Sequence, residues 1–204
     1  MSDNLAYVRR ELLDPVPDGQ SPGRVRSRYR RGEVAVSRLH AAKRWELFEG
    51  VVRESARPNQ PAPLFAAVDA ALGKVVGHRL FTLMVLDQAN GEAERVYTSD
   101  PVAYPVAGRK RSVDTPWFRQ VILGRRHYLG RTREDLRWAF ADHDLIERLG
   151  CGSVINVLAI YDDEVMGSAN LLHEEHHYSD ADIEDALPFV QLLVPALRSF
   201  AVEK

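Results

Sequence analysis

Cysteine is almost absent from this sequence of 204 residues, and its scarcity excludes several kinds of chemistry. Cys151 is the only cysteine, so the chain cannot form an internal disulfide or use two of its own thiols in one catalytic cycle. A chain without disulfides is typical of a reducing compartment. We therefore expect a cytoplasmic protein.

Long hydrophobic runs are also missing. No apolar run approaches the roughly 20 residues that a membrane-spanning helix needs. The first residues, MSDNLAYVRRELLDPV, contain no apolar core of signal-peptide length. The sequence thus predicts neither a contact with a membrane nor a secretory leader.

Neither sign of charge dominates the chain. The 27 Lys and Arg and the 29 Asp and Glu leave a net charge of −2, which excludes a protein whose whole surface binds nucleic acid. Basic residues gather near the N-terminus, where RVRSRYRR at 24–31 carries five arginines. We interpret this segment as a basic arm rather than a nucleic-acid-binding module, because no base-reading motif accompanies it.

The composition otherwise suits a globular protein, with 45% hydrophobic and 27% charged residues. RPNQPAP, at 57–63, holds three prolines and reads as a linker or a sharp turn. We predict an N-terminal extension over 1–57, made of a basic loop and then an amphipathic helix. A compact domain should follow over 62–202.

Several segments repeat apolar residues every three or four positions, which predicts helices. They cover 34–54 and 62–76, then 132–149 with an interruption near Asp142, and finally 180–202. A shorter helix should begin at Thr115. In the last helix, Pro188 and Pro195 should kink or break a heptad stripe. That stripe consists of Ile183, Leu187, Val190, Val194, Leu197 and Ala201.

Runs of β-forming residues predict strands, which occupy 79–87, 94–99, 127–130, 153–161 and 164–172. Asn90-Gly91 and Asp162-Asp163 join two pairs of them as tight turns. Hairpins connected by helices indicate an α+β domain with an antiparallel sheet. We expect the helices to group on one side of this sheet.

Two parts of this pattern resemble the GAF domain family. Near the C-terminus stand a strand that opens with RLGCGSVINV, a strand with V-x-G-x-x-N-L, and an aromatic-Ser-Asp-x-Asp motif at 178–182 before a long apolar helix. Residues 63–87, PLFAAVDAALGKVVGHRLFTLMVLD, resemble the opening helix and first strand of the same family. The resemblance spans 62–202.

The resemblance implies a GAF-like antiparallel sheet of about six strands flanked by helices, with the N-terminal helical extension outside it. It also implies a small-molecule pocket on one face of the sheet and a homodimer formed by the first and last helices. The alternative for the apolar stripes is that they cover the sheet of their own chain. No kinase, cyclase or DNA-binding module is recognisable, so a sensory signal would pass to a protein partner.

The ligand cannot be named from the resemblance. Members that bind cyclic nucleotides carry a lysine and a glutamate where this sequence has Leu171 and Ile183. Members that reduce methionine sulfoxide use several cysteines, and bilin-binding members use a cysteine in a particular loop, whereas Cys151 stands at the entry to a strand. We expect neither a cofactor nor a metal.

His173-Glu174-Glu175-His176-His177 satisfies the zinc motif H-E-x-x-H. That motif requires two histidines one helical turn apart, and here it falls at the end of a strand. We therefore reject a metalloprotease and read residues 175–177 as a polar loop. His173 remains a candidate pocket residue because it directly follows an apolar strand.

Polar and aromatic residues near the predicted strands are the candidate ligand-binding set. Buried amides need hydrogen-bond partners, so those inside apolar strands should contact either a ligand or a neighbouring loop. The set comprises Tyr97, Tyr104, Trp117, Trp138, Asp142, His143, Asn156, Asn170 and His173. We favour a sensory, regulatory binding domain. The competing hypothesis is an enzyme on the same fold that uses His143, Cys151 or His173.

Overall fold

The computed structural model describes residues 31–87, 92–106, 110–111 and 115–202. The predicted Asn90-Gly91 turn and arginines 24–30 lie outside the described residues. From Leu39 onward the chain forms one compact unit. None of the helices in the described ranges has the length and apolarity of a membrane span.

The described elements follow the order that the sequence predicts, with small shifts at their ends. The helices are α1 (Arg31–Ser55), α2 (Ala62–Val75), a π-helical turn η1 (Phe118–Leu123), α3 (Arg133–Ala139), α4 (His143–Arg148), α5 (Asp180–Gln191) and α6 (Val194–Val202). The strands are β1 (Leu80–Asp87), β2 (Glu92–Thr98), β3 (Lys110–Arg111), β4 (Tyr128–Gly130), β5 (Ser153–Tyr161) and β6 (Glu164–His173).

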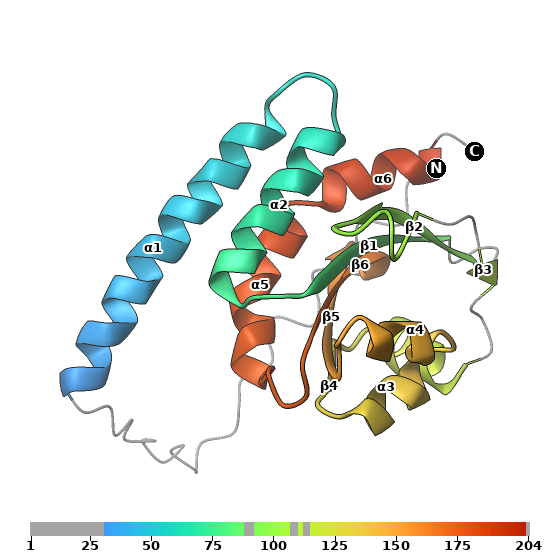
Figure 1. The fold of residues 1–204 in the computed structure, drawn as a ribbon. Helices are drawn as coiled ribbons and strands as arrows, with labels where there is room; N and C mark the ends of the chain where they lie inside the picture. Colours follow the sequence, from blue (N-terminus) through green and yellow to red (C-terminus); the bar gives the residue numbers. More distant parts are fainter. Residues whose placement is uncertain (1–30, 88–91, 107–109, 112–114, 203–204) are drawn as a thin grey trace, which may run out of the picture. The chain divides into compact units, whose positions relative to one another are not determined.

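The strands form one antiparallel sheet in the order β3-β2-β1-β6-β5-β4 (Figure 1). β5 and β6 pair along their whole length, from Ser153 opposite His173 to Tyr161 opposite Glu164. Asp162 and Asp163 join them with φ angles of 51° and 61°. Two left-handed residues in a row match the twist of a hairpin, so the predicted turn is confirmed.

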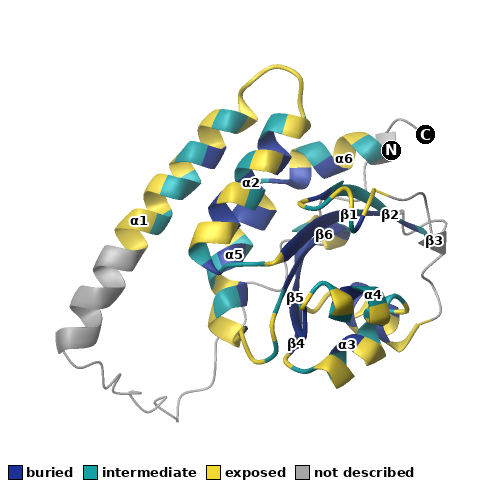
Figure 2. Ribbon diagram, in the orientation of Figure 1, coloured by how far each residue is buried: buried dark blue, intermediate teal, exposed yellow. Residues whose placement is uncertain are grey.

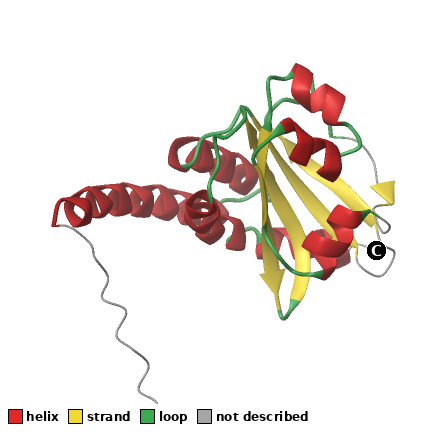
Figure 3. Cartoon of the chain, turned by 90° about the horizontal axis from the view of Figure 1, so that it is seen from below, coloured by secondary structure: helices red, strands yellow, loops and turns green. Residues whose placement is uncertain are grey.

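Helices cover both faces of this sheet (Figure 3), so the expectation that they group on one side is wrong. α2, α5, α6 and the part of α1 after Leu39 pack on one face, and η1, α3 and α4 pack on the other. The physical reason is visible in the central strands. β1, β5 and β6 are buried on both faces, and a strand without a solvent-facing side needs a helical layer on each (Figure 2).

Alternating side chains divide the interior into two cores. On the face covered by α2, α5 and α6, which we call the helical face, the strands contribute Phe81, Leu83, Val85, Ile155, Val157, Ala159, Ala169 and Leu171. On the opposite face, which we call the cavity face, they contribute Leu80, Leu86, Val154, Leu158 and Leu172. Thr82, Asn156, Ser168 and Asn170 are buried between these last residues along the strands.

Helix ends follow local chemistry. Thr132 and Ser179 each form a capping box with an aspartate three residues later, as predicted for Ser179. The closing helix ends at Gln191 and restarts at Val194. Pro188 therefore lies inside α5 and does not break it. Pro195 is the second residue of α6, where its missing N–H leaves no helical hydrogen bond unmade.

The pairing of β1 with β2 contains a β-bulge that decides which β2 residues reach the cavity face. Leu83 is opposite Tyr97, but Met84 is opposite Arg95, so Val96 is an extra residue. An extra residue reverses the alternation of side chains. Arg95 and Tyr97 consequently point to opposite faces, although they are two positions apart.

Gly167 marks the closest approach of backbone to backbone in the centre of the sheet. A Cβ atom built at this position would lie 2.2 Å from the carbonyl oxygen of Met84 on β1. Such a distance is far below van der Waals contact. Only glycine allows β6 to run beside β1 here.

Candidate functional site

A cavity of about 200 Å³ lies between the cavity face of the sheet and the segment that carries α3 and α4. Strands β1, β2 and β6 supply its floor, and the connections around η1, α3 and α4 supply its walls. Its lining residues are Thr82, Met84, Arg95, Tyr104, Thr115, Trp117, Ala139, Phe140, Ala141, Asp142, Ile146, Asn170 and Leu172. Mostly apolar walls with a few converging polar groups are typical of small-molecule sites.

Buried hydrogen bonds fix the floor of the cavity. Trp117 Nε1 donates to Asn156 Oδ1 at 2.9 Å, and Asn156 Nδ2 donates to Asn170 Oδ1 at 2.8 Å. Asn170 Oδ1 also accepts from Ser168 Oγ at 3.1 Å, and Asn170 Nδ2 donates to Thr82 Oγ1 at 3.1 Å. These bonds satisfy the expectation that both amides need partners. Asn156, which is 0% exposed, braces the lining residues Trp117 and Asn170 from behind.

One wall of the cavity is formed by Arg95, Tyr104 and Asp142. Tyr104 Oη donates to Asp142 Oδ2 at 2.5 Å, and the Arg95 guanidinium carbon lies 3.8 Å from the centre of the Tyr104 ring. Burial and the Asp142 carboxylate raise the pKa of Tyr104 well above its ordinary value, so its hydroxyl stays protonated and keeps donating. Tyr104 and Asp142 were both predicted from the sequence as ligand-binding residues.

Tyr97 lies on the helical face, away from the cavity. Its ring centre is 5.9 Å from those of Phe65 and Phe81, and its hydroxyl donates to Asp69 at 2.7 Å. The bulge at Val96 explains this placement, because it turns Tyr97 toward α2.

Trp138 and His143 flank the cavity without lining it. The Trp138 side chain is 41% exposed on α3 and packs against Tyr128, with ring centres 5.5 Å apart. His143 begins α4, and its Nδ1 lies 3.0 Å from the carbonyl oxygen of Phe140. His143 thus holds the turn between α3 and α4 beside Asp142, where it can fix the position of the lining residue.

His173 ends β6 on the opposite face from the cavity, because odd-numbered residues near the end of this strand face the helical side. Its ring stacks on His177 with centres 3.6 Å apart, and its Nδ1 accepts the backbone N–H of Glu174 at 2.9 Å. Burial, followed by the neighbouring cations, lowers its pKa. The chain turns between the two histidines of the H-E-x-x-H pattern, with His176 at φ 62°, so they do not lie one helical turn apart. Across the described ranges, no three His, Cys, Asp or Glu side chains converge as metal ligands.

Cys151 is a core residue. It is 1% exposed and packs among apolar side chains on the cavity face. Burial raises the pKa of the thiol to about 11, so almost none of it is thiolate at neutral pH. This environment therefore does not favour Cys151 as a nucleophile.

Arg95 is a charged lining residue that sequence reasoning missed. It comes from the middle of β2, where strict alternation would place it on the same face as Tyr97. The extra residue in β2 is the cause of its inward position, and such a bulge leaves no reliable mark in a single sequence. Its only available signal was the presence of a charged residue within a short strand.

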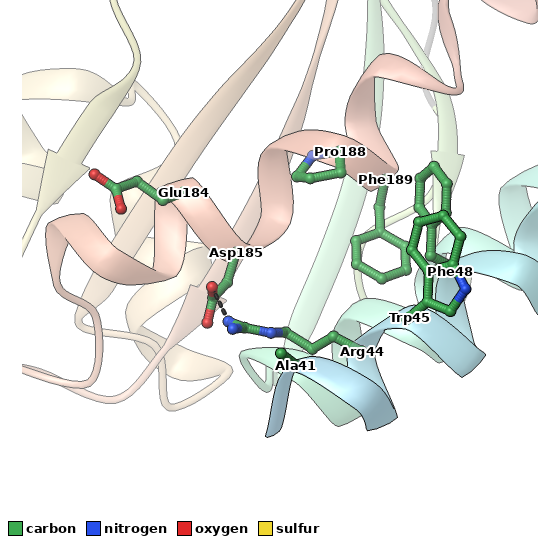
Figure 4. A pocket seen from close by; sticks show the side chains of 8 residues that line it. All are labelled: Ala41, Arg44, Trp45, Phe48, Glu184, Asp185, Pro188 and Phe189. Carbon is green, nitrogen blue, oxygen red and sulfur yellow. Dashed lines mark ion pairs between the residues drawn. The ribbon is translucent and has the colours of Figure 1, made fainter. Parts of the chain in front are cut away.

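A second hollow lies on the helical face, between α1 and α5. It has a volume of about 320 Å³ and contains the ion pair of Arg44 with Asp185 at one end (Figure 4). Phe48 meets Phe189 edge-on at 5.6 Å and stacks on Trp45 at 5.6 Å. A wider groove of about 690 Å³ runs over the end of α1, the start of α2, the end of α5 and much of α6.

Comparisons with solved structures agree with this architecture. The GAF domain of a phosphoenolpyruvate-protein phosphotransferase from Coxiella burnetii has a TM-score of 0.62 at 14% identity, covering 80% of this chain and 97% of that one. The GAF domain of a two-component sensor histidine kinase from Bacillus halodurans gives 0.55 at 9%, covering 68% and 94%. The chromophore-binding domain of a Stigmatella aurantiaca bacteriophytochrome gives 0.54 at 11%, covering 77% and 60%.

No protein-family model and no curated protein matches the sequence. The likeness therefore rests on the three-dimensional arrangement, at identities that establish a fold and nothing more. An antiparallel sheet with helices on both faces and a cavity under one of them is an α+β domain of the GAF type. The predicted fold class is confirmed, and the chain contains a GAF-like domain.

Proposed function

We propose that this chain is a sensory module that binds a small molecule in the cavity on the cavity face. The observation that carries the proposal is the cavity itself, whose floor is held by a chain of buried hydrogen bonds and whose wall carries Arg95 and Asp142. A preformed hollow with fixed polar groups is suited to recognising one compound. Neighbours of the same fold come from a sensor kinase and from a chromophore-binding domain, which supports a sensory role.

The test is to purify the chain under native conditions, release bound small molecules and identify them by mass spectrometry. The variant Ala139→Met adds a flexible side chain to the cavity wall, and Ala70→Met places the same change on an exposed face of α2. We expect a compound in wild-type protein and in Ala70→Met, and at least tenfold less in Ala139→Met. Equal amounts in all three, or none in any, would contradict the proposal.

We further propose a homodimer formed through α1. Trp45 and Val52 are 60% and 42% exposed, and they are seven residues apart, so they lie on one side of this helix. Large exposed apolar side chains beside an apolar hollow are typical of protein interfaces. The apolar stripe of the closing helix is not free to form the dimer surface, because Ile183, Val190 and Leu197 are buried in the core of their own chain. This favours α1 as the dimer surface.

Sedimentation equilibrium tests the dimer. Trp45→Glu should weaken self-association at least tenfold, because a carboxylate would replace an apolar anchor in the interface. Trp138→Glu is the matched control, since Trp138 is also exposed but lies on the other side of the sheet. A wild-type monomer at high protein concentration, or equal weakening by both variants, would refute the assignment.

Residues 62–202 would then be the ligand-binding domain and 1–57 the extension that carries part of the dimer surface. The cytoplasmic location and a protein partner that receives the signal remain predictions from the sequence. So does the absence of a cofactor and of a metal.

A further inference from the structure

Arg95 brings more hydrogen-bond donors to the cavity than the described residues use. Its side chain is only 13% exposed. Its Nη1 donates to the carbonyl oxygen of Pro105 at 2.7 Å, whereas its Nε is buried without a partner in the described part of the chain. Its Nη2 lies 3.9 Å from Asp142 Oδ2, which is too long for a hydrogen bond.

The unused donors share one edge of the guanidinium. Nε–H and one N–H of Nη2 point in parallel, and this edge binds the two oxygens of a carboxylate in a fork. Leaving such donors unpaired inside a protein costs more free energy than leaving them in water. This edge therefore fits an anionic group with two oxygens in one plane.

A ligand that brought only a carboxylate would meet a second negative charge. Asp142 also lines the cavity, and its Oδ2 is engaged by Tyr104, while Oδ1 has no hydrogen bond to any described residue. A ligand cation on Oδ1 would remove the repulsion. Because Arg95 and Asp142 approach to 3.9 Å, the two ligand charges must be close neighbours within the molecule.

The rest of the cavity is small and mostly apolar. Its larger apolar residues are Met84, Trp117, Phe140, Ile146 and Leu172. Its polar residues Thr82, Thr115 and Asn170 already hydrogen-bond within the protein, so the uncharged part of the ligand should be hydrophobic. At the packing density of protein interiors, a volume of about 200 Å³ leaves about 150 Å³ for the ligand, on the order of ten non-hydrogen atoms.

We propose that the cavity takes an α-amino acid with an apolar side chain, whose carboxylate pairs with Arg95 and whose ammonium group pairs with Asp142. The inference deepens the proposed function and rests on it. An α-amino acid carries its two charged groups on one carbon atom, which matches the close spacing of the two protein charges. Its side chain would then lie against the aromatic wall made by Trp117 and Phe140.

Isothermal titration calorimetry at neutral pH tests the proposal with matched probes. The twenty common L-amino acids are titrated first, and the best apolar binder is then compared with its decarboxylated amine and its deaminated acid. For L-leucine these are 3-methylbutan-1-amine and 4-methylpentanoic acid. We expect one or more apolar amino acids to bind, and each stripped analogue to bind at least tenfold more weakly.

Variants separate recognition from folding. Arg95→Gln should weaken binding of the amino acid by about 30-fold or more, because a buried charged hydrogen bond is lost. Arg95→Lys keeps the charge without the fork and should recover part of this loss. Arg198→Gln, at an exposed position of α6, is the matched control and should leave affinity unchanged. Urea unfolding of each variant checks that the fold is intact.

Asp142→Asn supplies a readout that a purely structural role would not give. It removes the partner of the ammonium group, so affinity for the amino acid should fall while affinity for the deaminated acid rises. Equal binding of the amino acid and its analogues, or an unchanged affinity in Arg95→Gln, would overturn the proposal. Should no amino acid bind while mass spectrometry finds a compound without a carboxylate, this inference fails and the proposed function stands. If no compound is found at all, both fail.

Discussion

Replacing Asn156 by leucine tests whether the buried amide network holds the wall of the cavity. Leucine has the same branched skeleton as asparagine, so the substitution removes the hydrogen bonds while it keeps the outline of the side chain, although the methyl groups take more room than the amide. Asn156 is completely buried, and its Oδ1 is the acceptor for Trp117 Nε1. In the variant the indole N–H keeps its buried position and loses its only partner among the described residues.

The expected loss of stability follows from the hydrogen-bonding groups that Asn156→Leu leaves without a partner. An unpaired buried N–H costs about 1–3 kcal/mol, and this penalty falls on Trp117, which is 7% exposed. Asn170 Oδ1 loses one donor but keeps Ser168, so it adds at most about 1 kcal/mol. We expect Asn156→Leu to lower the free energy of unfolding by about 2–3 kcal/mol, and the melting temperature by about 4–10 °C.

Urea unfolding monitored by circular dichroism measures this loss, and a double-mutant cycle assigns it. Trp117→Phe removes the N–H that Asn156→Leu leaves unpaired. The double variant should therefore be more stable than the sum of the two single losses predicts, by about 1–2 kcal/mol. Additive losses, or a cost below about 0.5 kcal/mol for Asn156→Leu, would refute the reasoning that this network is a structural brace.

Three further outcomes follow from the same structure. Stability should decline as pH falls below about 6.5, because the lowered pKa values of His127 and His173 make the unfolded chain bind more protons there than the folded chain does. His127→Asn should make this decline smaller in urea midpoints measured from pH 7 to 5. Gly167→Ala should lower the free energy of unfolding by about 3 kcal/mol or more. Gly50→Ala, which has open space around its Cβ on α1, should raise the free energy of unfolding by about 0.5–1 kcal/mol. Equal effects of the two substitutions would contradict the close approach of β6 to β1 at Gly167. Cys151 should react with iodoacetamide only at the rate of unfolding, and rapid labelling of the native chain would show that its burial is overstated.

The candidate site was only partly predictable. Of the predicted residues, Tyr104, Trp117, Asp142 and Asn170 line the cavity. Tyr97 and Asn156 were chosen on the same grounds but do not line it, because such residues can also pack in the core or brace a neighbour. The position of His173 away from the cavity could have been predicted from the alternation of side chains along its strand. Asn170 and His173 are an odd number of positions apart on one strand, so they cannot face the same side.

Local chemistry in the sequence determined the elements of this protein. The apolar runs over 153–161 and 164–172, the paired aspartates between them and the capping boxes each act within a few residues, so they can be read without knowledge of the rest of the chain. The tertiary structure alone decided which residues meet. The pairing of β1 with β2 leaves Val96 as an extra residue, and this bulge places Arg95 in the cavity and Tyr97 on the other face. Pairing between strands depends on the fit of the whole sheet, and no stretch of sequence carries that information by itself.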